Sequence, residues 1–157
     1  MAPVLLIDTD RDGWKRWGAA KTVPAEGSAL RLETDGKNCY VGIKLDGASA
    51  LKPQTKYRLS YFVRTKDLVS PTGARGGYGA CMEVEHYGDK AFGGKYKAVR
   101  TPEASYFSGT LDARHQAVEF TTDDWVGKGS YKAMLWLRVF KAQGTAWFDG
   151  VRLEEIK

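Results

Sequence analysis

Residues 142–153 read Ala-Gln-Gly-Thr-Ala-Trp-Phe-Asp-Gly-Val-Arg-Leu, and this stretch decides the fold. Alternate side chains of a β-strand share a face, yet the apolar Phe148 is out of phase with the apolar Val151 and Leu153. One extra residue at Asp149-Gly150 restores the phase, as a β-bulge does. We therefore predict a closing strand that is bulged at Asp149, with the carboxylate of Asp149 re-aimed by the bulge.

Short segments with a period of two, separated by turn residues, run through the rest of the sequence. They are Val4–Ile7, Leu30–Glu33, Val41–Leu45, Tyr57–Arg64, Ala80–Glu85, Val118–Phe120 and Leu135–Val139. With the closing strand they make eight, and they predict an all-β antiparallel sandwich of two sheets. The period predicts these core residues: Val41, Ile43, Leu59, Val63, Met82, Val84, Val118, Phe120, Leu135, Leu137 and Val139. The stretches 65–77 and 88–114 predict loops.

Length and composition predict one domain over residues 1–157 with no membrane span. Hydrophobic residues make up 43% and charged residues 27%, the balance of a globular protein. No apolar run approaches the roughly 20 residues of a spanning helix, and residues 1–7 lack the basic start and cleavage site of a signal peptide. The net charge of +5 comes from scattered residues, which indicates a solvated surface rather than a nucleic-acid site.

The two cysteines, Cys39 and Cys81, each fall inside a predicted strand. Free cysteine is one of the most buried residue types, so the sequence predicts two buried thiols. A disulfide is the alternative, and it requires the two Cα atoms to lie within about 7 Å.

Three segments carry a family resemblance. Residues 142–153 look like the closing strand of certain sugar-binding modules, residues 26–32 (Glu-Gly-Ser-Ala-Leu-Arg-Leu) resemble their G-x-x-S-L-x-L strand entry, and residues 51–60 (Leu-Lys-Pro-Gln-Thr-Lys-Tyr-Arg-Leu-Ser) resemble their L-x-P-G-T-x-Y-x-L-S segment. In this order they are similar to the jelly-roll carbohydrate-binding modules of families four, nine, sixteen and twenty-two. The resemblance implies jelly-roll topology of the galactose-binding-domain-like kind and non-catalytic binding of a glycan. Gln54 departs from it, where Gly is common, and residues 6–10 lack the usual N-G-x-F-E.

The outward positions of two predicted strands hold a mixture suited to sugars: Glu83, Glu85 and Tyr87 on one, and Trp136 and Arg138 on the other. A sugar ring has apolar C–H faces that pack on aromatic rings and hydroxyls that need polar partners. We predict that Trp136 stacks on a sugar while Glu83, Glu85 and Arg138 bind hydroxyls or a uronic-acid carboxylate. Tyr87 and Tyr106 would close the sides, and Trp14 would contact the rim. The alternative is that residues 88–114 simply cover Trp136.

Two other classes of function stay open at this stage. The same aromatic patch could serve a protein-interaction or adhesion module. A small glycan-active enzyme could use Glu83 and Glu85, since glycoside hydrolysis needs two carboxylates, although two neighbours on one strand would not flank a substrate well. The sequence has no nucleophile elbow and no metal-binding His pair, and His86 and His115 have predicted structural roles. We therefore predict a binding module rather than an enzyme.

The resemblance also implies a metal and a setting. Similar modules commonly hold Ca²⁺ between their first and last strands, and Asp149 stands where a ligand is usual, with Asp8 and Glu26 as candidate companions. Carboxylate oxygens are the ligands that Ca²⁺ prefers. The resemblance further implies a secreted or cell-surface protein in which other glycan-acting domains accompany this one, any export signal lying outside this sequence.

Overall fold

The computed structural model describes residues 4–8, 13–18, 21–24, 29–36, 38–70, 78–103 and 106–157. These residues form eleven β-strands and two short 3₁₀ helices, at Gly47–Ser49 and Lys90–Phe92. The strands are β1 (Val4–Asp8), β2 (Lys15–Gly18), β3 (Lys21–Pro24), β4 (Leu30–Asp35), β5 (Cys39–Lys44), β6 (Lys56–Val69), β7 (Gly79–Tyr87), β8 (Tyr96–Thr101), β9 (Gly109–Thr121), β10 (Lys132–Phe140) and β11 (Gln143–Glu155). No helix in the described ranges is long and apolar enough to cross a membrane.

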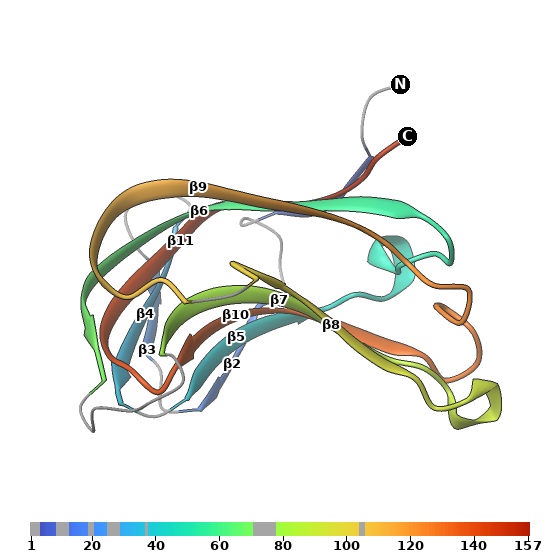
Figure 1. Ribbon diagram of the computed structural model, residues 1–157, viewed down its shortest axis with the longest axis horizontal. Coiled ribbons are helices and arrows are strands. Elements are labelled where there is room, and N and C mark those ends of the chain that lie inside the picture. The colour runs from blue at the N-terminus through green and yellow to red at the C-terminus, as the bar shows by residue number, and fades with distance from the viewer. Residues whose placement is uncertain are drawn as a thin grey trace.

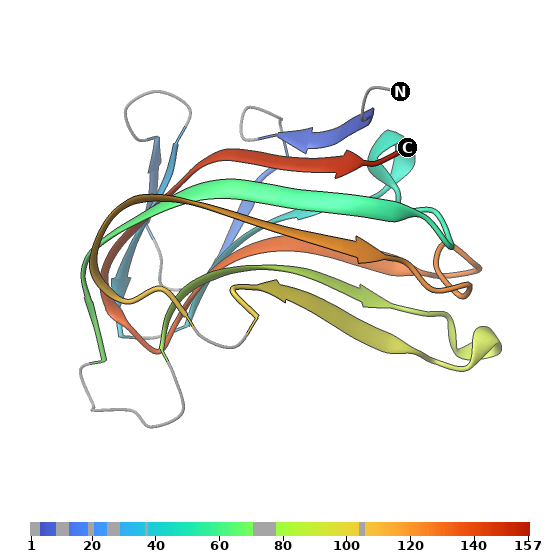
Figure 2. The same cartoon turned by 45° about the horizontal axis from the view of Figure 1, so that its top comes forward.

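The strands form two antiparallel sheets that pack face to face (Figure 1). Sheet A has six strands in the order β3-β4-β11-β6-β9, with β1 also pairing with β11, and sheet B has five in the order β2-β5-β10-β7-β8. Sheet B arches so that its concave side faces away from sheet A (Figure 1). The strands β8 and β9 are edges of their sheets, and both termini lie at one end of the molecule (Figure 2). The predicted all-β antiparallel sandwich is confirmed.

The core lies between the sheets and follows the predicted period of two. Of the residues predicted to face inward, Val118 and Phe120 are half-buried and pack against the core, and the others are buried. Leu135, Leu137 and Val139 of β10 have no exposed surface at all. The side chains between them on β10 must therefore point out of sheet B.

The predicted bulge at Asp149 is present. Asp149 is paired with Phe62 of β6 while Arg152 is paired with Ser60, so β11 carries one extra residue between these pairs. Gly150 takes a φ of 55°, and the bulge keeps the residues on both sides of it in the core. At the same point the other neighbour of β11 changes from β4 to β1.

The two stretches predicted to be loops are partly strands, so this prediction is wrong. β6 continues to Val69 within 65–77, and β8 and the start of β9 lie within 88–114. β8 is an exposed edge strand, so its sequence is largely polar and lacks a clear alternation. Beyond Val63 the pairing of β6 with β9 is broken by two register shifts, which interrupt the period of two. The strands β2 and β3 are further additions to the predicted set.

Both cysteines are buried free thiols, as predicted. Cys39 lies opposite Val139 and Cys81 lies opposite Arg138, on the two strands that flank β10. Successive residues of β10 point to opposite faces, so the two thiols also point to opposite faces of sheet B. Burial raises the pKa of the Cys81 thiol to about 12, which makes this thiol unreactive near neutral pH.

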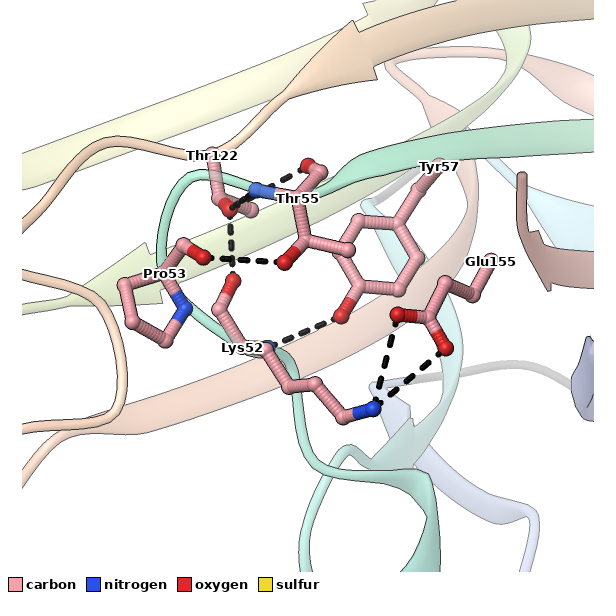
Figure 3. A network of polar contacts seen from close by, with 6 residues as sticks. All are labelled: Lys52, Pro53, Thr55, Tyr57, Thr122 and Glu155. Carbon is pink, nitrogen blue, oxygen red and sulfur yellow. Dashed lines mark hydrogen bonds and ion pairs between the residues drawn. The ribbon is translucent and has the colours of Figure 1, made fainter. Parts of the chain in front are cut away.

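The segment before β6 joins three parts of the chain through hydrogen bonds (Figure 3). The Lys52 N–H donates to the Tyr57 hydroxyl at 2.8 Å, and the Lys52 carbonyl accepts from the Thr122 hydroxyl at 2.5 Å. The Thr55 N–H donates to Thr122 Oγ1 at 3.0 Å, and the Lys52 ammonium lies 3.4 Å from the Glu155 carboxylate. Lys52, Thr55 and Tyr57 of this segment thus connect the start of β6, the residue after β9 and the end of β11.

Within this segment, Gln54 has a φ of 49°, in the left-handed region where Gly is favoured. A residue with a side chain destabilises the folded state by roughly 1–2 kcal/mol when it takes this conformation. A glycine in its place stabilises the unfolded state by about 0.4–1 kcal/mol, because it gives the unfolded chain more conformational entropy. We therefore expect Gln54→Gly to raise the free energy of unfolding in urea by about 0.5 kcal/mol. Gln54→Ala is the matched control and should give no gain. Equal stability of the two variants would contradict the prediction.

A buried aromatic cluster holds the end of sheet B near β9. The Nδ1 atom of His86 lies 2.6 Å from the Tyr131 hydroxyl, and its ring lies 4.9 Å from the ring of Trp125. His86 is only 1% exposed. Burial lowers the pKa of His86 to about 4, and the nearby Lys97 acts in the same direction while Asp123 opposes it. The imidazole is therefore neutral in the native protein at pH 7.

This pKa makes stability depend on pH. Between pH 6.5 and 4 the unfolded chain protonates His86 while the native protein does not, so native stability falls as the pH falls through this window. We expect the stability advantage of the wild type over His86→Gln in urea to shrink by about 1–3 kcal/mol from pH 7 to pH 4. His115→Gln, at an exposed position, is the control and should follow the wild-type profile. A constant difference between wild type and His86→Gln would contradict this reading of the cluster.

Candidate ligand-binding site

The outer face of sheet B brings together side chains that the sequence predicted to act as one site. β10 and β7 are adjacent, with Trp136 paired opposite Glu83 and Met134 opposite Glu85. On its other side β10 pairs with β5, where Trp136 lies opposite Gly42 and Arg138 opposite Tyr40. We call the set Trp136, Arg138, Glu83, Glu85, Tyr40 and Tyr96 the Trp136 cluster.

Trp136 packs closely against β5 because residue 42 is a glycine. A Cβ atom built on Gly42 would lie 2.5 Å from Cε3 and 2.6 Å from Cζ3 of the indole, closer than real contacts allow. The ring of Tyr40 meets the indole edge-on, with the ring centroids 5.8 Å apart. Trp136 is half-buried, so the strand beneath and the tyrosine beside it fix the orientation of an aromatic ring on the surface.

Glu85 is the centre of the polar contacts. Its carboxylate accepts a hydrogen bond from the indole N–H of Trp136 at 3.3 Å and one from the Tyr96 hydroxyl at 2.9 Å. The Arg138 guanidinium lies 3.6 Å from Glu85 and 3.5 Å from Glu83. The guanidinium carbon also lies 5.0 Å from the centroid of the Tyr40 ring. Aromatic rings and charges therefore hold one another in a fixed arrangement.

The electrostatics of the cluster are set by burial. Glu83 is 8% exposed, and burial raises the pKa of its carboxyl above the ordinary value. Arg138 opposes this shift and Glu85 adds to it. The hydroxyl of Tyr96 has a pKa raised to about 12, first by burial and then by its bond to Glu85. One arginine between two carboxylates leaves acceptor oxygens available for sugar hydroxyls.

Aromatic residues flank the cluster at both ends of the outer face. At one end Tyr87, which is 48% exposed, packs beside the cluster member Tyr96, which is 55% exposed, with ring centroids 4.9 Å apart. At the other end Tyr106 stacks on Phe140 at 5.7 Å, and its hydroxyl accepts a hydrogen bond from Arg100 at 2.8 Å. The structure thus places both tyrosines predicted to close the sides of the site next to the same sheet face.

We gave a cover over Trp136 as the alternative role of residues 88–114, and the structure instead makes part of this segment a strand of sheet B. The segment supplies β8, which pairs with β7 and is separated from β10 by that strand. Tyr96 and Arg100 come from this strand, and sequence reasoning missed them because β8 had been assigned to a loop. Tyr40 and Gly42 were also missed, although the outward phase of Tyr40 and a glycine inside a strand were both visible signals.

At one edge of sheet B, Trp14 directly precedes Lys15, which pairs opposite Gly42. Trp14 is half-buried and packs against the hydrophobic core. Its contact with the rim of the site stays a prediction.

The structure describes two of the three predicted calcium ligands, Asp149 and the backbone of Asp8. The exposed carboxylate of Asp149 accepts a hydrogen bond from the N–H of Gly150 at 2.8 Å, so it caps its own bulge. The backbone of Asp8 pairs opposite Arg152, and Glu26 lies outside the described residues. Among the residues that the structure describes, no three His, Cys, Asp or Glu side chains gather as a metal site would require. The calcium site stays a prediction.

No family model matches the sequence, and no curated protein matches it. Among solved structures, a family 16 carbohydrate-binding module is 27% identical, with 90% of each chain covered and a TM-score of 0.59. The CBM22-1 xylan-binding domain of Xyn10C from Paenibacillus barcinonensis is 13% identical, covering 99% of this chain and 97% of that one at a TM-score of 0.58.

The same fold also occurs in a solved enzyme structure. The Stig cyclase Fisc from Fischerella sp. TAU is 18% identical, covering 97% of this chain and 88% of its own at a TM-score of 0.56. The fold alone therefore does not decide between binding and catalysis. A family 4 module matches at a TM-score of 0.57 over 97% of this chain. In architecture the chain is a jelly-roll β-sandwich similar to the carbohydrate-binding modules of families 16, 4 and 22.

Proposed function

We propose that this protein is a non-catalytic carbohydrate-binding module that holds a glycan across the outer face of sheet B. The observation that carries the proposal is the ring of Trp136, which packs closely on Gly42 and lies beside the charged groups of Glu85 and Arg138. An indole face accepts the C–H face of a sugar, and carboxylates and a guanidinium accept and donate hydrogen bonds to its hydroxyls. The likeness to solved carbohydrate-binding modules supports the same function.

The cluster is organised before any ligand arrives. The contacts of Glu85 with Trp136, Tyr96 and Arg138 already restrict these side chains, so binding loses less side-chain entropy than on an unstructured surface. The exposed rings of Tyr87 and Tyr96 extend the aromatic surface beyond Trp136. Because these aromatic groups are spread over three neighbouring strands, they suit a chain of several sugar units better than a single one.

The enzyme alternative is less well supported by the geometry. Glu83 and Glu85 are two positions apart on one strand, and both lie within 3.6 Å of the same arginine. Glycosidases place one carboxylate on each side of the scissile bond, about 5 to 9.5 Å apart. An adhesion module would use the same surface with a protein ligand, and a glycan array distinguishes it from the proposal because it should then give no signal.

The setting of the module belongs to the proposal as well. A xylan-binding domain of the same fold is part of the protein Xyn10C, which supports a place beside other domains of a glycan-acting protein. Such proteins meet their polysaccharides outside the cell, so we propose a secreted or cell-surface location.

Removing the ring of Trp136 tests the proposal directly. We expect Trp136→Ala to weaken binding of the best glycan-array ligand by at least about tenfold, or 1.4 kcal/mol, in calorimetric titration. A half-buried ring packs fewer core atoms, so the loss of stability in urea should stay below the roughly 3–5 kcal/mol of a buried Trp. Trp136→Phe keeps a smaller aromatic face and loses the indole N–H that bonds Glu85, so it should retain more affinity than Trp136→Ala. A full-affinity Trp136→Ala variant would refute this site.

The glycine beneath the ring provides an independent test. Gly42→Ala leaves every polar group of the cluster in place but pushes the indole away from β5. We expect a measurable fall in glycan affinity together with a loss of about 1–3 kcal/mol of stability, as in other overpacked sites. Gly47→Ala is a control for lost stability without a change at the cluster: a Cβ there meets no atom within 4 Å, but the φ of 56° disfavours a side chain, so stability should fall while glycan affinity stays unchanged. If Gly42→Ala binds the glycan as well as the wild type, the close packing of the ring on Gly42 is irrelevant to binding.

A further inference from the structure

A second hollow lies on the opposite side of the sandwich, on the outer face of sheet A. Its volume is about 200 Å³, and the residues that matter for its chemistry are Arg64, Lys66, Asp67, Thr110, Asp112 and Trp147. They come from β6, β9 and β11, at the place where the pairing of β6 with β9 is interrupted. None of these residues belongs to the Trp136 cluster.

The backbone shapes this hollow. Register shifts on both sides of Thr65 make β6 bulge, and Asp67 takes a φ of 51°. The bulged segment lies so close to β11 that a Cβ atom at Gly144 would be 2.4 Å from the carbonyl oxygen of Asp67. The Asp67 N–H donates a hydrogen bond to Thr110 Oγ1 at 3.0 Å, which connects β6 to the start of β9. The walls of the hollow are therefore fixed by main-chain contacts.

The charges of the hollow differ from the other charges of the same face. Elsewhere on sheet A cross-strand or neighbouring charges pair, at 2.8 Å for Arg31–Glu33, 2.9 Å for Arg58–Glu119 and 3.5 Å for Arg152–Glu154. In the hollow, the side chains of Arg64, Lys66 and Asp112 make no hydrogen bond or ion pair with any other described residue. The Arg64 guanidinium lies 4.0 Å over the centroid of the Trp147 ring, so it is held in place with its donors unused.

We propose that this hollow is a second ligand site, for a single neutral sugar ring. Its volume is smaller than the roughly 300–1,000 Å³ of pockets for drug-sized ligands, which suits one ring rather than an oligosaccharide. Two cationic and two anionic side chains line it, so it has no net charge to favour an acidic ligand. Hydroxyls of a neutral sugar both donate and accept, and they match Asp112 on one side and Arg64 and Lys66 on the other. The indole of Trp147 and the side chain of Leu111 supply apolar surface for the C–H groups.

This site is independent of the glycan face on sheet B. A module with one site on each face could bind two sugar chains at once. The hollow would then hold the end unit of one chain while the Trp136 cluster holds another chain. Two weak sites gain avidity when both are engaged on the same polysaccharide surface.

The test is a ¹H–¹⁵N NMR titration with methyl glycosides of glucose, galactose, mannose and xylose, and with methyl glucuronide as the acidic counterpart. We expect at least one neutral glycoside to give saturable shifts of the amides of Lys66, Asp67, Thr110 and Asp112, with a Kd of the order of millimolar. The glucuronide should bind no more tightly than glucoside. Saturable shifts should persist in Trp136→Ala, which separates this site from the one on sheet B.

Two exposed residues of the hollow provide variants that should fold normally, Lys66→Ala and Asp112→Asn. Each variant should raise the Kd fitted from the shifts of the remaining hollow amides by at least about tenfold. Lys128→Ala and Asp124→Asn are matched controls at exposed positions outside the hollow, and they should leave this Kd unchanged. The proposal is overturned if no glycoside gives saturable shifts up to about 50 mM, or if the shifts survive both hollow variants.

Discussion

Burial of one side of β10 is the constraint on which the rest of the structure depends. Leu135, Leu137 and Val139 occupy the centre of the core, and a β-strand that buries alternate residues must expose the ones between. Trp136 and Arg138 therefore stand on the outer face of sheet B as a direct result of how the core is filled. Since β10 is the middle strand of its sheet, β5 and β7 on either side supply the neighbours of these two side chains.

The two outer faces of the sandwich use charge in different ways. On sheet B the charges around Trp136 are joined to one another, and this network orients an aromatic ring before a ligand binds. On sheet A most charges are also paired, but the side chains of Lys66 and Asp112 in the hollow make no hydrogen bond or ion pair with another described residue. A glycan at the proposed site on sheet B would meet a prepared surface, whereas a ligand in the hollow would itself complete the hydrogen bonds.

A structural feature could be predicted from the sequence where a local pattern of residues reflects it directly. The period of two reflects which side chains are buried, so the core residues could be predicted from it. The bulge at Asp149 could be predicted because Phe148 and Val151 are out of phase with each other. The outward placement of Trp136 and Glu83 follows from the same rule. Their direct pairing depends on strand order, which the family resemblance suggested and no local pattern contains. β8 could not be predicted because an exposed edge strand buries little, and with it the contact of Tyr96 with Glu85 was missed.

The charged edges of the two sheets have a consequence for the behaviour of the protein at high concentration. An exposed edge strand presents unpaired N–H and C=O groups on which another chain can assemble, and β8 and β9 are such edges. Lys97 and Arg100 on β8, and Arg114 and Glu119 on β9, place charges along these edges and oppose the docking of a second strand. Many copies of the protein at high concentration should therefore remain separate molecules, without fusing into a continuous sheet or aggregating.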